Sequence, residues 1–366
     1  MKDCRSRPIL ILAQSYPHVK NVLYLIDLHF QNSSKIKLLV FGNKYLFHFF
    51  KEINNEHFDN QIEINFIPKY RPFFQNTLFR YILVFEKYFL LRIFKSSCHE
   101  VSGYKIYFFS KSFTDYGYYF LKRLYKKNSI TYVQDPGVDV YNISDRKSEN
   151  LKSFLIITYL KLLLGKDYVY GDTGRVKFHR FFKISENFYN KIVDKEILED
   201  ERNRLQADFN LSKYSIKDYE DLQAIYFDKD IVKDGLCDDA QFQSEIEEVF
   251  KIIAEFFPND KIGRKYKPNR TTSYNRNRLN VGKVIPDYIP AELLYNENIK
   301  CYFGITSIAL ANIDIGNVIS LIYLFSFNNI HQRDATIKNQ EARRKGKIIY
   351  YPKTLSELRN QIKLLK

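Results

Sequence analysis

Residues 8–41, PILILAQSYPHVKNVLYLIDLHFQNSSKIKLLVF, predict one strand, one helix and a second strand. Pro8–Ala13 is a short, continuous apolar run, and Ile36–Phe41 is apolar except for Lys37. Such runs are typical of strands buried on both faces of a sheet. Between them, the apolar residues of Val19–Phe30 recur at the spacing of a helix face. Two buried strands joined through a helix indicate a βαβ unit with parallel strands.

The same alternation continues along the chain. Strands are expected at Ile62–Ile67, Ile106–Phe109 and Ile130–Val133, with helical stretches near 75–95 and 112–126. After a charged stretch at 194–221, a second series adds strands at Ala224–Phe227, Lys261–Lys265, Cys301–Gly304 and Val318–Leu324, and helices at Ala240–Phe257, Pro290–Tyr295 and Ser307–Asn312. This order predicts an α/β protein of two halves, with ligands in the cleft beyond the carboxyl ends of the strands.

Composition and charge limit the classes of function. The chain has 366 residues, enough for about two domains, and its 45% hydrophobic content excludes a disordered protein. It carries 57 Lys and Arg against 42 Asp and Glu. Residues 1–130 hold 20 basic and 9 acidic groups, 131–260 hold 18 and 26, and 261–366 hold 19 and 7. The two basic segments indicate an anionic partner: nucleic acid, a phosphorylated ligand or a membrane surface.

Cysteine and histidine usage argues against metal and disulfide chemistry. Cys4, Cys98, Cys237 and Cys301 form no CxxC or Cys/His spacing, so a reduced, cytosolic chain is expected. The 7 histidines are scattered, which disfavours a metal-dependent mechanism. No signal peptide and no apolar run of about 18 residues is present, so the chain is not expected to span a membrane.

The most basic segment is residues 261–283, KIGRKYKPNRTTSYNRNRLNVGK. It holds 8 basic residues and no acidic one. Arg and Lys side chains with interleaved Thr, Ser and Tyr hydroxyls suit a phosphate or diphosphate site. A solvated basic loop or a membrane-facing patch is the alternative, and the charge alone does not decide between them.

Two strand ends are followed by acidic turns. The stretch 224–235, AIYFDKDIVKDG, places Asp228, Asp230 and Asp234 after a strand, and 133–141, VQDPGVDVY, does so with Asp135 and Asp139. A carboxylate there could act as a general base toward a hydroxyl group. Ordinary turn chemistry is the simpler interpretation of both stretches, because Asp-Gly is a common turn pair.

A third strand end carries hydroxyl groups. In residues 301–312, CYFGITSIALAN, a strand is expected to end at Gly304 and a helix to begin near Thr306 and Ser307. Backbone N–H groups and hydroxyls at a helix N-terminus can bind an anion. The alternative is an N-cap, which is the common reason for Ser or Thr at such a position.

Taken in order, these segments resemble the bacterial lipooligosaccharide sialyltransferase family, with the capsule sialyltransferases as more distant relatives. The similarity extends over most of the chain. It includes AQSYPHVKNVLYLI near the start, QDPGVDVY at the end of the first half, FDKDIVKDG before the helix SEIEEVFKIIAEFF, and KYKPNR where the family has Lys-x-His-Pro-Arg. The best match, IPAELLYNENIKCYFGITSIALAN, resembles the family's Pro-Ala-Glu helix and Ser-Ser/Ser-Thr motif.

The resemblance implies an inverting glycosyltransferase of the GT-B fold, with an acceptor-side Rossmann-like domain at 1–215 and a nucleotide-side domain at 216–366. It implies no metal and no cofactor, with CMP-sialic acid as the nucleotide-sugar co-substrate. Asp234 would be the general base, with Asp135 as its substitute, and Lys267 would stabilise the leaving phosphate. The nucleotide-sugar site would comprise Gly235, Lys265, Pro268, Arg270, Gly304, Thr306 and Ser307.

Departures from the family's motifs leave alternatives open. Lys267 stands where the family has a histidine, and Lys233 where it has a glutamate. A hexosyltransferase of the same fold that uses a UDP-sugar is one alternative, and a non-catalytic or nucleic-acid-binding basic protein is another. No nucleic-acid motif is present, so the expected partners are a glycan or glycolipid acceptor and the anionic inner face of the membrane, in the cytoplasm. A homodimer is left open.

Overall fold

The computed structural model describes residues 7–366 except 33, 69–81, 99, 110–111, 114–116, 135–143, 146–153, 155–157, 160, 164, 166–167, 173–179, 215–216, 229–230, 233, 267–280, 314 and 344–347. The chain divides into two compact units, residues 1–209 and 210–366. This division falls a few residues before the boundary expected at residue 215.

The first unit is built on a parallel sheet. Its described strands are β1 (Ile9–Ala13), β2 (Ile36–Phe41), β3 (Glu63–Ile67), β4 (Lys105–Phe108), β6 (Ser129–Val133) and β10 (Lys195–Ile197). They lie in the order β10-β6-β4-β1-β2-β3, with every neighbouring pair parallel. The central strand β1 is fully buried, and Ile9 is in register with both Ile36 and Lys105. This order is the doubly wound Rossmann-like one, and the βαβ unit predicted for residues 8–41 is confirmed.

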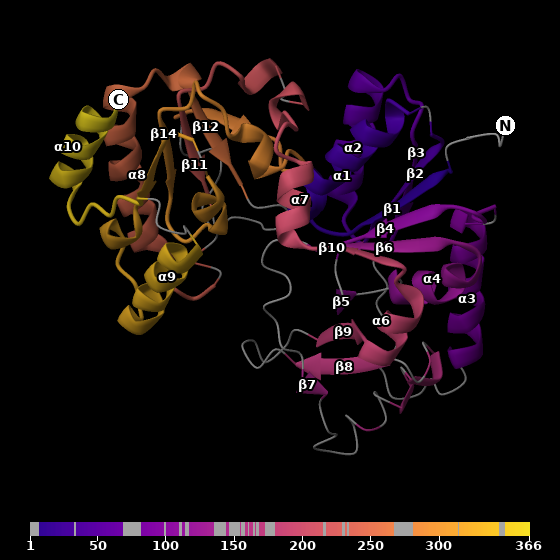
Figure 1. The fold of residues 1–366 in the computed structure, drawn as a ribbon. Coiled ribbons are helices and arrows are strands. Elements are labelled where there is room, and N and C mark those ends of the chain that lie inside the picture. Colours follow the sequence, from indigo (N-terminus) through magenta and orange to yellow (C-terminus); the bar gives the residue numbers. More distant parts are fainter. Residues whose placement is uncertain are drawn as a thin grey trace. The chain divides into compact units, whose positions relative to one another are not determined.

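Helices cover both faces of this sheet (Figure 1). On one face lie α1 (Val19–Phe30) and α2 (Lys44–His57), and on the other α3 (Ile82–Cys98), α4 (Gly117–Leu124) and α6 (Glu186–Ile192). The sequence analysis did not predict α2. Its start is fixed by Asn43, whose side-chain oxygen accepts a hydrogen bond from the N–H of Leu46.

A small antiparallel sheet corrects one prediction. It contains β5 (Ser112–Phe113), β9 (Arg180–Ile184), β8 (Tyr168–Asp172) and β7 (Ser144–Asp145), in that order. The helical stretch expected at 112–126 was wrong at its start, because Ser112 and Phe113 pair with Lys183 and Phe182. The described helix is limited to α4 and a 3₁₀ turn at Tyr125–Lys127. A two-residue strand held by a distant partner leaves no periodic signal in the sequence.

The second unit repeats the parallel arrangement. Its described strands are β11 (Ala224–Phe227), β12 (Ile262–Lys265), β13 (Lys283–Ile285), β14 (Cys301–Gly304) and β15 (Asn317–Ser320), in the order β13-β12-β11-β14-β15. The strand expected at Val318–Leu324 ends earlier, because a 3₁₀ turn at Ile322–Leu324 follows Ser320. A GT-B chain contains two successive Rossmann-like parallel sheets, as this chain does. The predicted α/β fold class is therefore confirmed.

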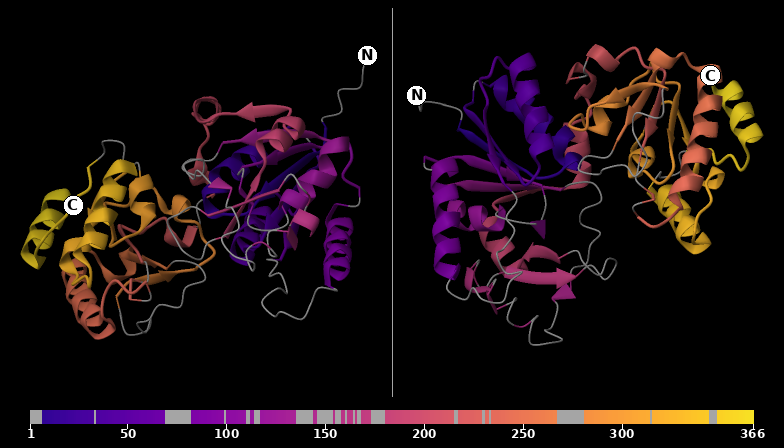
Figure 2. Two further views of the ribbon diagram at one scale, coloured as in Figure 1. Left: turned by 90° about the horizontal axis from the view of Figure 1, so that it is seen from below. Right: turned by 180° about the vertical axis from the view of Figure 1, so that it is seen from behind.

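Helices pack on one face of the second sheet: α8 (Asp239–Phe256), α9 (Ile330–Arg343) and α10 (Leu355–Leu365). The carboxylate of Asp238 caps α8 by accepting from the N–H groups of Ala240 and Gln241. Helices α8 and α10 lie side by side in both views of Figure 2. Arg359 of α10 makes two 2.8 Å hydrogen bonds to Glu255 of α8. The opposite face carries short 3₁₀ helices, η6 (Ala291–Leu294) and η7 (Ile308–Asn312).

Three cysteines are buried in the two cores as free thiols. Burial raises the pKa of Cys98 and Cys301 to about 12 and that of Cys237 to about 11. Thiols with such pKa values are protonated and unreactive at neutral pH.

Candidate functional site

The carboxyl edge of the second sheet gathers buried polar side chains. The strand register aligns Lys265, Phe227, Gly304 and Ser320, the last residues of β12, β11, β14 and β15. Four polar side chains at this edge are at most 5% exposed. They are Lys265, Ser320, Asp228 just beyond β11 and Thr306 just beyond β14. Polar side chains are usually exposed, and α/β sheets bind ligands at this edge. The buried polar side chains therefore mark a candidate functional site.

Lys265 places a positive charge at this edge. Its ammonium donates hydrogen bonds to the carbonyl oxygens of Tyr266 (3.0 Å) and Asp287 (3.2 Å). Its own carbonyl accepts from the N–H of Asp228 at 2.8 Å, which ties the ends of β11 and β12 together. These two carbonyl groups hold the ammonium at the carboxyl edge of the second sheet.

A second buried group lies on the α8 face of the same edge. Tyr226 donates to Asp228 Oδ1 at 3.3 Å, and the guanidinium carbon of Arg264 lies 6.0 Å from the centre of the Tyr266 ring. Burial raises the pKa of Tyr226 well above 10, and the neighbouring Asp228 adds to the effect. Arg264 belongs to the basic segment 261–283, but this cluster was not predicted from the sequence. The signal was the alternation in AIYFD and IGRKY, which points every second side chain to one face.

Thr306 and Ser307 differ in how their hydroxyls are used. Ser307 Oγ accepts from the N–H of Ala309 at 3.3 Å, so the N-cap interpretation is confirmed for this residue. The helix expected at Ser307–Asn312 is the five-residue 3₁₀ helix η7, which is too short to carry a helix-dipole anion site. Thr306 Oγ1 is buried and makes no hydrogen bond among the described residues. A buried hydroxyl of this kind is destabilising by about 1–3 kcal/mol unless a ligand satisfies it.

A polar network from α9 supports the segment that carries Thr306. The side-chain amide of Gln340 donates to the carbonyl of Ile305 at 3.3 Å, and its oxygen lies 3.2 Å from the Ser320 hydroxyl. Ser320 Oγ also lies 3.4 Å from the same Ile305 carbonyl. Gln340 is 4% exposed and Ser320 is fully buried. Neither residue was predicted from the sequence, because only folding brings α9 against β14 and β15.

The two glycines named from the sequence have backbone reasons to be glycine. A Cβ atom on Gly304 would lie 3.0 Å from the carbonyl oxygen of Phe227, so a side chain would push β14 away from β11. Gly235 has φ +72°, a left-handed conformation that closes the turn around Asp234. Asp234 is exposed on that turn. The turn interpretation of the Asp-Gly pair is thus confirmed, and the role of Asp234 as a base stays a prediction.

Several residues named from the sequence lie outside the described residues. They are Asp135, Asp139, Asp230, Lys233, Lys267, Pro268 and Arg270. Their assigned roles stay predictions.

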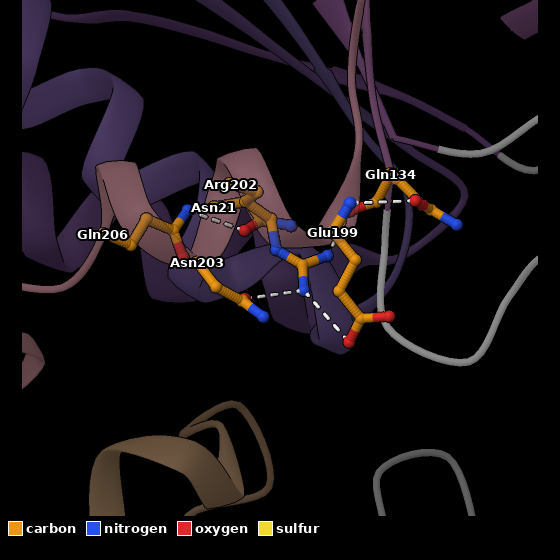
Figure 3. A network of polar contacts seen from close by, with 6 residues as sticks. All are labelled: Asn21, Gln134, Glu199, Arg202, Asn203 and Gln206. Carbon is orange, nitrogen blue, oxygen red and sulfur yellow. Dashed lines mark hydrogen bonds and ion pairs between the residues drawn. The ribbon is translucent and has the colours of Figure 1, made fainter.

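The carboxyl edge of the first sheet carries its own polar network (Figure 3). Arg202 of α7 (Glu199–Leu205) donates to the backbone carbonyl of Gln134 and, at 3.0 Å, to the side chain of Asn203. The side-chain oxygen of Gln134 accepts from the N–H of Glu199 at 2.9 Å, and Gln206 donates to Asn21 of α1 at 2.8 Å. These groups satisfy one another, so this network fixes α7 over β6 and β10.

A depression of about 660 Å³ lies elsewhere in the second unit, lined by Asp218, Tyr219, Asp221, Lys283 and Val284. Lys283 begins β13 and Asp221 precedes β11, so this hollow lies at the amino end of the strands. Asp221 pairs there with Lys261 at 2.5 Å and Lys283 at 3.8 Å. It is therefore separate from the buried groups at the carboxyl edge.

Within the described residues, no group of three or more His, Cys, Asp and Glu side chains is arranged to hold a metal ion.

Neither a protein-family model nor a curated protein matches the chain. Among solved structures, a UDP-glucosyltransferase from Polygonum tinctorium is similar at 9% identity and a TM-score of 0.38, covering 98% of this chain and 90% of its own. MurG of Acinetobacter baumannii matches at 10% identity and a TM-score of 0.34, covering 98% and 91%. Similarities this weak do not bear on what the chain does.

Proposed function

We propose that the chain is a glycosyltransferase that binds the nucleotide of its sugar donor at the carboxyl edge of the second sheet. The observation that carries this proposal is the buried Thr306 hydroxyl, which makes no hydrogen bond among the described residues. It lies at a sheet edge that also holds the buried ammonium of Lys265. A donor hydroxyl and a positive charge at the carboxyl ends of parallel strands suit a nucleotide phosphate.

The chemistry proposed is a direct displacement with inversion at the anomeric carbon. A hydroxyl oxygen of the acceptor forms the new bond to that carbon, while the bond from the carbon to the phosphate oxygen breaks. The bonding electron pair leaves with the phosphate, and the hydroxyl proton passes to the Asp234 carboxylate. Lys265 and Thr306 would stabilise the departing phosphate, with Lys267 and Arg270 assigned to the same task from the sequence. Since cationic side chains balance the charge, this scheme calls for no metal ion.

For the donor we propose CMP-sialic acid, with transfer to a glycan of a cell-surface polysaccharide or lipooligosaccharide. This choice rests on the resemblance of residues 289–312 to the sialyltransferase motifs. A UDP-hexose is the competing donor, because Lys267 replaces the histidine of those motifs. At its ordinary pKa of about 10.4, a lysine stabilises a phosphate by charge and seldom by proton donation.

A donor screen tests this proposal. The full chain is incubated with CMP-sialic acid, UDP-sugars and GDP-sugars, and its melting temperature and the release of free nucleotide are measured. CMP-sialic acid is expected to raise the melting temperature the most and to release CMP when a glycan acceptor is added. If UDP-hexoses alone raised the melting temperature, the proposed donor would change to a UDP-hexose and the proposed glycosyltransferase class would stand. A folded chain that responds to none of these donors would refute the proposal.

The base is tested separately with Asp234→Asn. This variant should bind the donor as the wild type does, because Asp234 is an exposed turn residue, and should lose about 100-fold or more in transfer rate. Asp218→Asn, at another exposed aspartate of the same unit, serves as the control and should keep full activity. Unchanged transfer by Asp234→Asn would eliminate Asp234 as the base.

A further inference from the structure

One side of α3 is exposed and combines aromatic rings with positive charge. Tyr88 is 65% exposed and Phe89 49% exposed, and both lie next to exposed Arg92 and Lys95. At 3.6 residues per turn these four side chains share one face of the helix. Leu90 on the opposite face is fully buried in the core. The helix is therefore anchored on one side and presents an amphipathic surface on the other.

Helix α4 extends this surface. Phe94 of α3 packs edge-on against Tyr119 and Phe120 of α4, with ring centres 6.4 and 5.3 Å apart. The guanidinium carbon of Arg123 lies 5.9 Å from the Phe94 ring and 4.8 Å from the Tyr119 ring. Arg123 is exposed, so it adds a positive charge next to Phe94 of α3. Figure 1 shows α3 and α4 as neighbours on one face of the first sheet.

Among the described side chains of α3 and α4, the charge has one sign. Residues 88–98 and 117–128 contain no Asp or Glu; their cations are Arg92, Lys95, Lys122, Arg123, Lys126 and Lys127. Lys126 and Lys127 lie exposed in the 3₁₀ turn that follows α4. We call the exposed residues Tyr88, Phe89, Arg92, Lys95, Arg123, Lys126 and Lys127 the α3–α4 face.

Further apolar side chains are exposed in the first unit. Phe154 is 53% exposed and Leu162 is 60% exposed, in a stretch whose Tyr159 and Leu163 join the same core cluster as Leu90. The ammonium of Lys122 in α4 lies against Gly165 at the end of this stretch, so the two segments are neighbours. Exposed Phe, Tyr and Leu side chains within a cationic surface are typical of proteins that lie on membranes.

We propose that the α3–α4 face binds the surface of an anionic lipid bilayer. The cations would meet lipid phosphates, and the rings of Tyr88 and Phe89 would enter the headgroup region. Binding would be peripheral: in the part of the chain that the structure describes, no helix is long and apolar enough to cross a bilayer. The inference concerns the first unit only and stands apart from the proposed nucleotide site. A nucleic acid fits less well, because phosphate binding alone does not require exposed apolar side chains.

Co-sedimentation with lipid vesicles tests this inference. The full chain is mixed with vesicles of phosphatidylcholine alone, or with about one third phosphatidylglycerol, and the bound fraction is measured. Binding is expected only with the anionic vesicles and should weaken about tenfold or more in Arg92→Glu/Lys95→Glu. Tyr88→Ser/Phe89→Ser should weaken it several-fold with no change in net charge. Lys338→Glu/Lys363→Glu, at exposed lysines of the second unit, is the matched control and should bind as the wild type does.

Thermal unfolding of each variant shows that it is folded before its binding is compared. The proposal is overturned if anionic vesicles fail to bind the wild type. Equal weakening by the control pair would also overturn it, because the binding would then reflect net charge alone. Binding to single-stranded RNA that the α3–α4 substitutions abolish, without vesicle binding, would assign the face to nucleic acid instead.

Discussion

At the scale of single residues, Thr306 connects the fold to the proposed function. Thr306→Val keeps the shape of the side chain and removes a hydroxyl that makes no hydrogen bond among the described residues. We therefore expect an unchanged or slightly higher melting temperature and about tenfold weaker nucleotide binding, the loss of one hydrogen bond. Calorimetric titration measures the affinity. Thr306→Ser retains the hydroxyl and should bind nearly as the wild type does. Full nucleotide affinity in Thr306→Val would show that Thr306 is not part of the nucleotide site.

His29 predicts a pH dependence of stability. Its Nε2 lies 2.9 Å from the hydroxyl of Tyr107 in the first unit. Burial, with a smaller effect from the charge of Lys105, lowers the pKa of His29 to about 4. Between about pH 6.5 and 4 the unfolded chain binds a proton at this residue and the native chain does not, so stability falls as the pH falls.

Urea unfolding at pH 7.5 and pH 5 measures this effect. His29→Gln cannot titrate and should lose less stability than the wild type between the two pH values. His331→Gln, at an exposed histidine in α9, should follow the wild type. Equal losses in His29→Gln and the wild type would show that His29 is protonated as easily in the native chain as in the unfolded one.

At the scale of elements, Arg202 fixes α7 to the first sheet. Its side chain is 6% exposed and bonded to the Gln134 carbonyl, to Asn203 and to Glu199. Arg202→Ala removes a buried side chain and the donor to the half-buried Gln134 carbonyl, and should lower the free energy of unfolding by about 2 kcal/mol. Arg204→Ala, at an exposed position of the same helix, should stay within about 0.5 kcal/mol of the wild type. Chemical denaturation compares the two, and equal effects would contradict the role given to the network.

Helix α9 should act on the candidate site through Gln340. Gln340→Leu removes the hydrogen bond to the Ile305 carbonyl, next to Thr306, and should weaken nucleotide binding several-fold. If Gln340 only positions Thr306, the substitution should have little further effect on affinity in a Thr306→Val background. Lys338→Leu, at an exposed position of α9, is the control. Additive losses in the double variant would show that Gln340 acts independently of Thr306.

Most elements could be predicted where local sequence determines them. Buried parallel strands such as β1, β11 and β14 appear as continuous apolar runs, and α1 and α8 as amphipathic periods. The exceptions depend on distant partners. Ser112 and Phe113 form a strand only because residues 182 and 183 lie beside them. Helix α7 lies within a charged stretch that has too few apolar residues to show a face.

At the scale of the whole molecule, the candidate site was predicted in part. The carboxyl ends of β12 and β14 pointed to Lys265 and Thr306, because strand ends can be located from sequence. Ser320, Gln340 and the group around Arg264 could not be predicted, because they meet only through packing between strands and α9. The Ser307 hydroxyl caps η7, as the N-cap interpretation predicts, and its place in a nucleotide-sugar site stays a prediction.

Positive charge occurs in two different environments in this chain. In the first unit, exposed cations on α3 and α4 surround exposed aromatic rings, which suits a lipid surface. In the second unit, Lys265 is buried at a sheet edge that also carries the buried hydroxyl of Thr306, which suits one small anion. The excess of 57 basic over 42 acidic residues therefore does not require a nucleic-acid partner.

The most direct test of the account is hydrogen exchange of the full chain, followed by mass spectrometry, with and without saturating CMP, UDP or GDP. The account predicts that at least one of these nucleotides slows exchange in peptides covering residues 224–237 and 301–321, at the carboxyl edge of the second sheet. Exchange in β1, β2 and β3 of the first unit should be unaffected. Protection confined to the first unit, or no protection by any of the three nucleotides, would contradict the central claim.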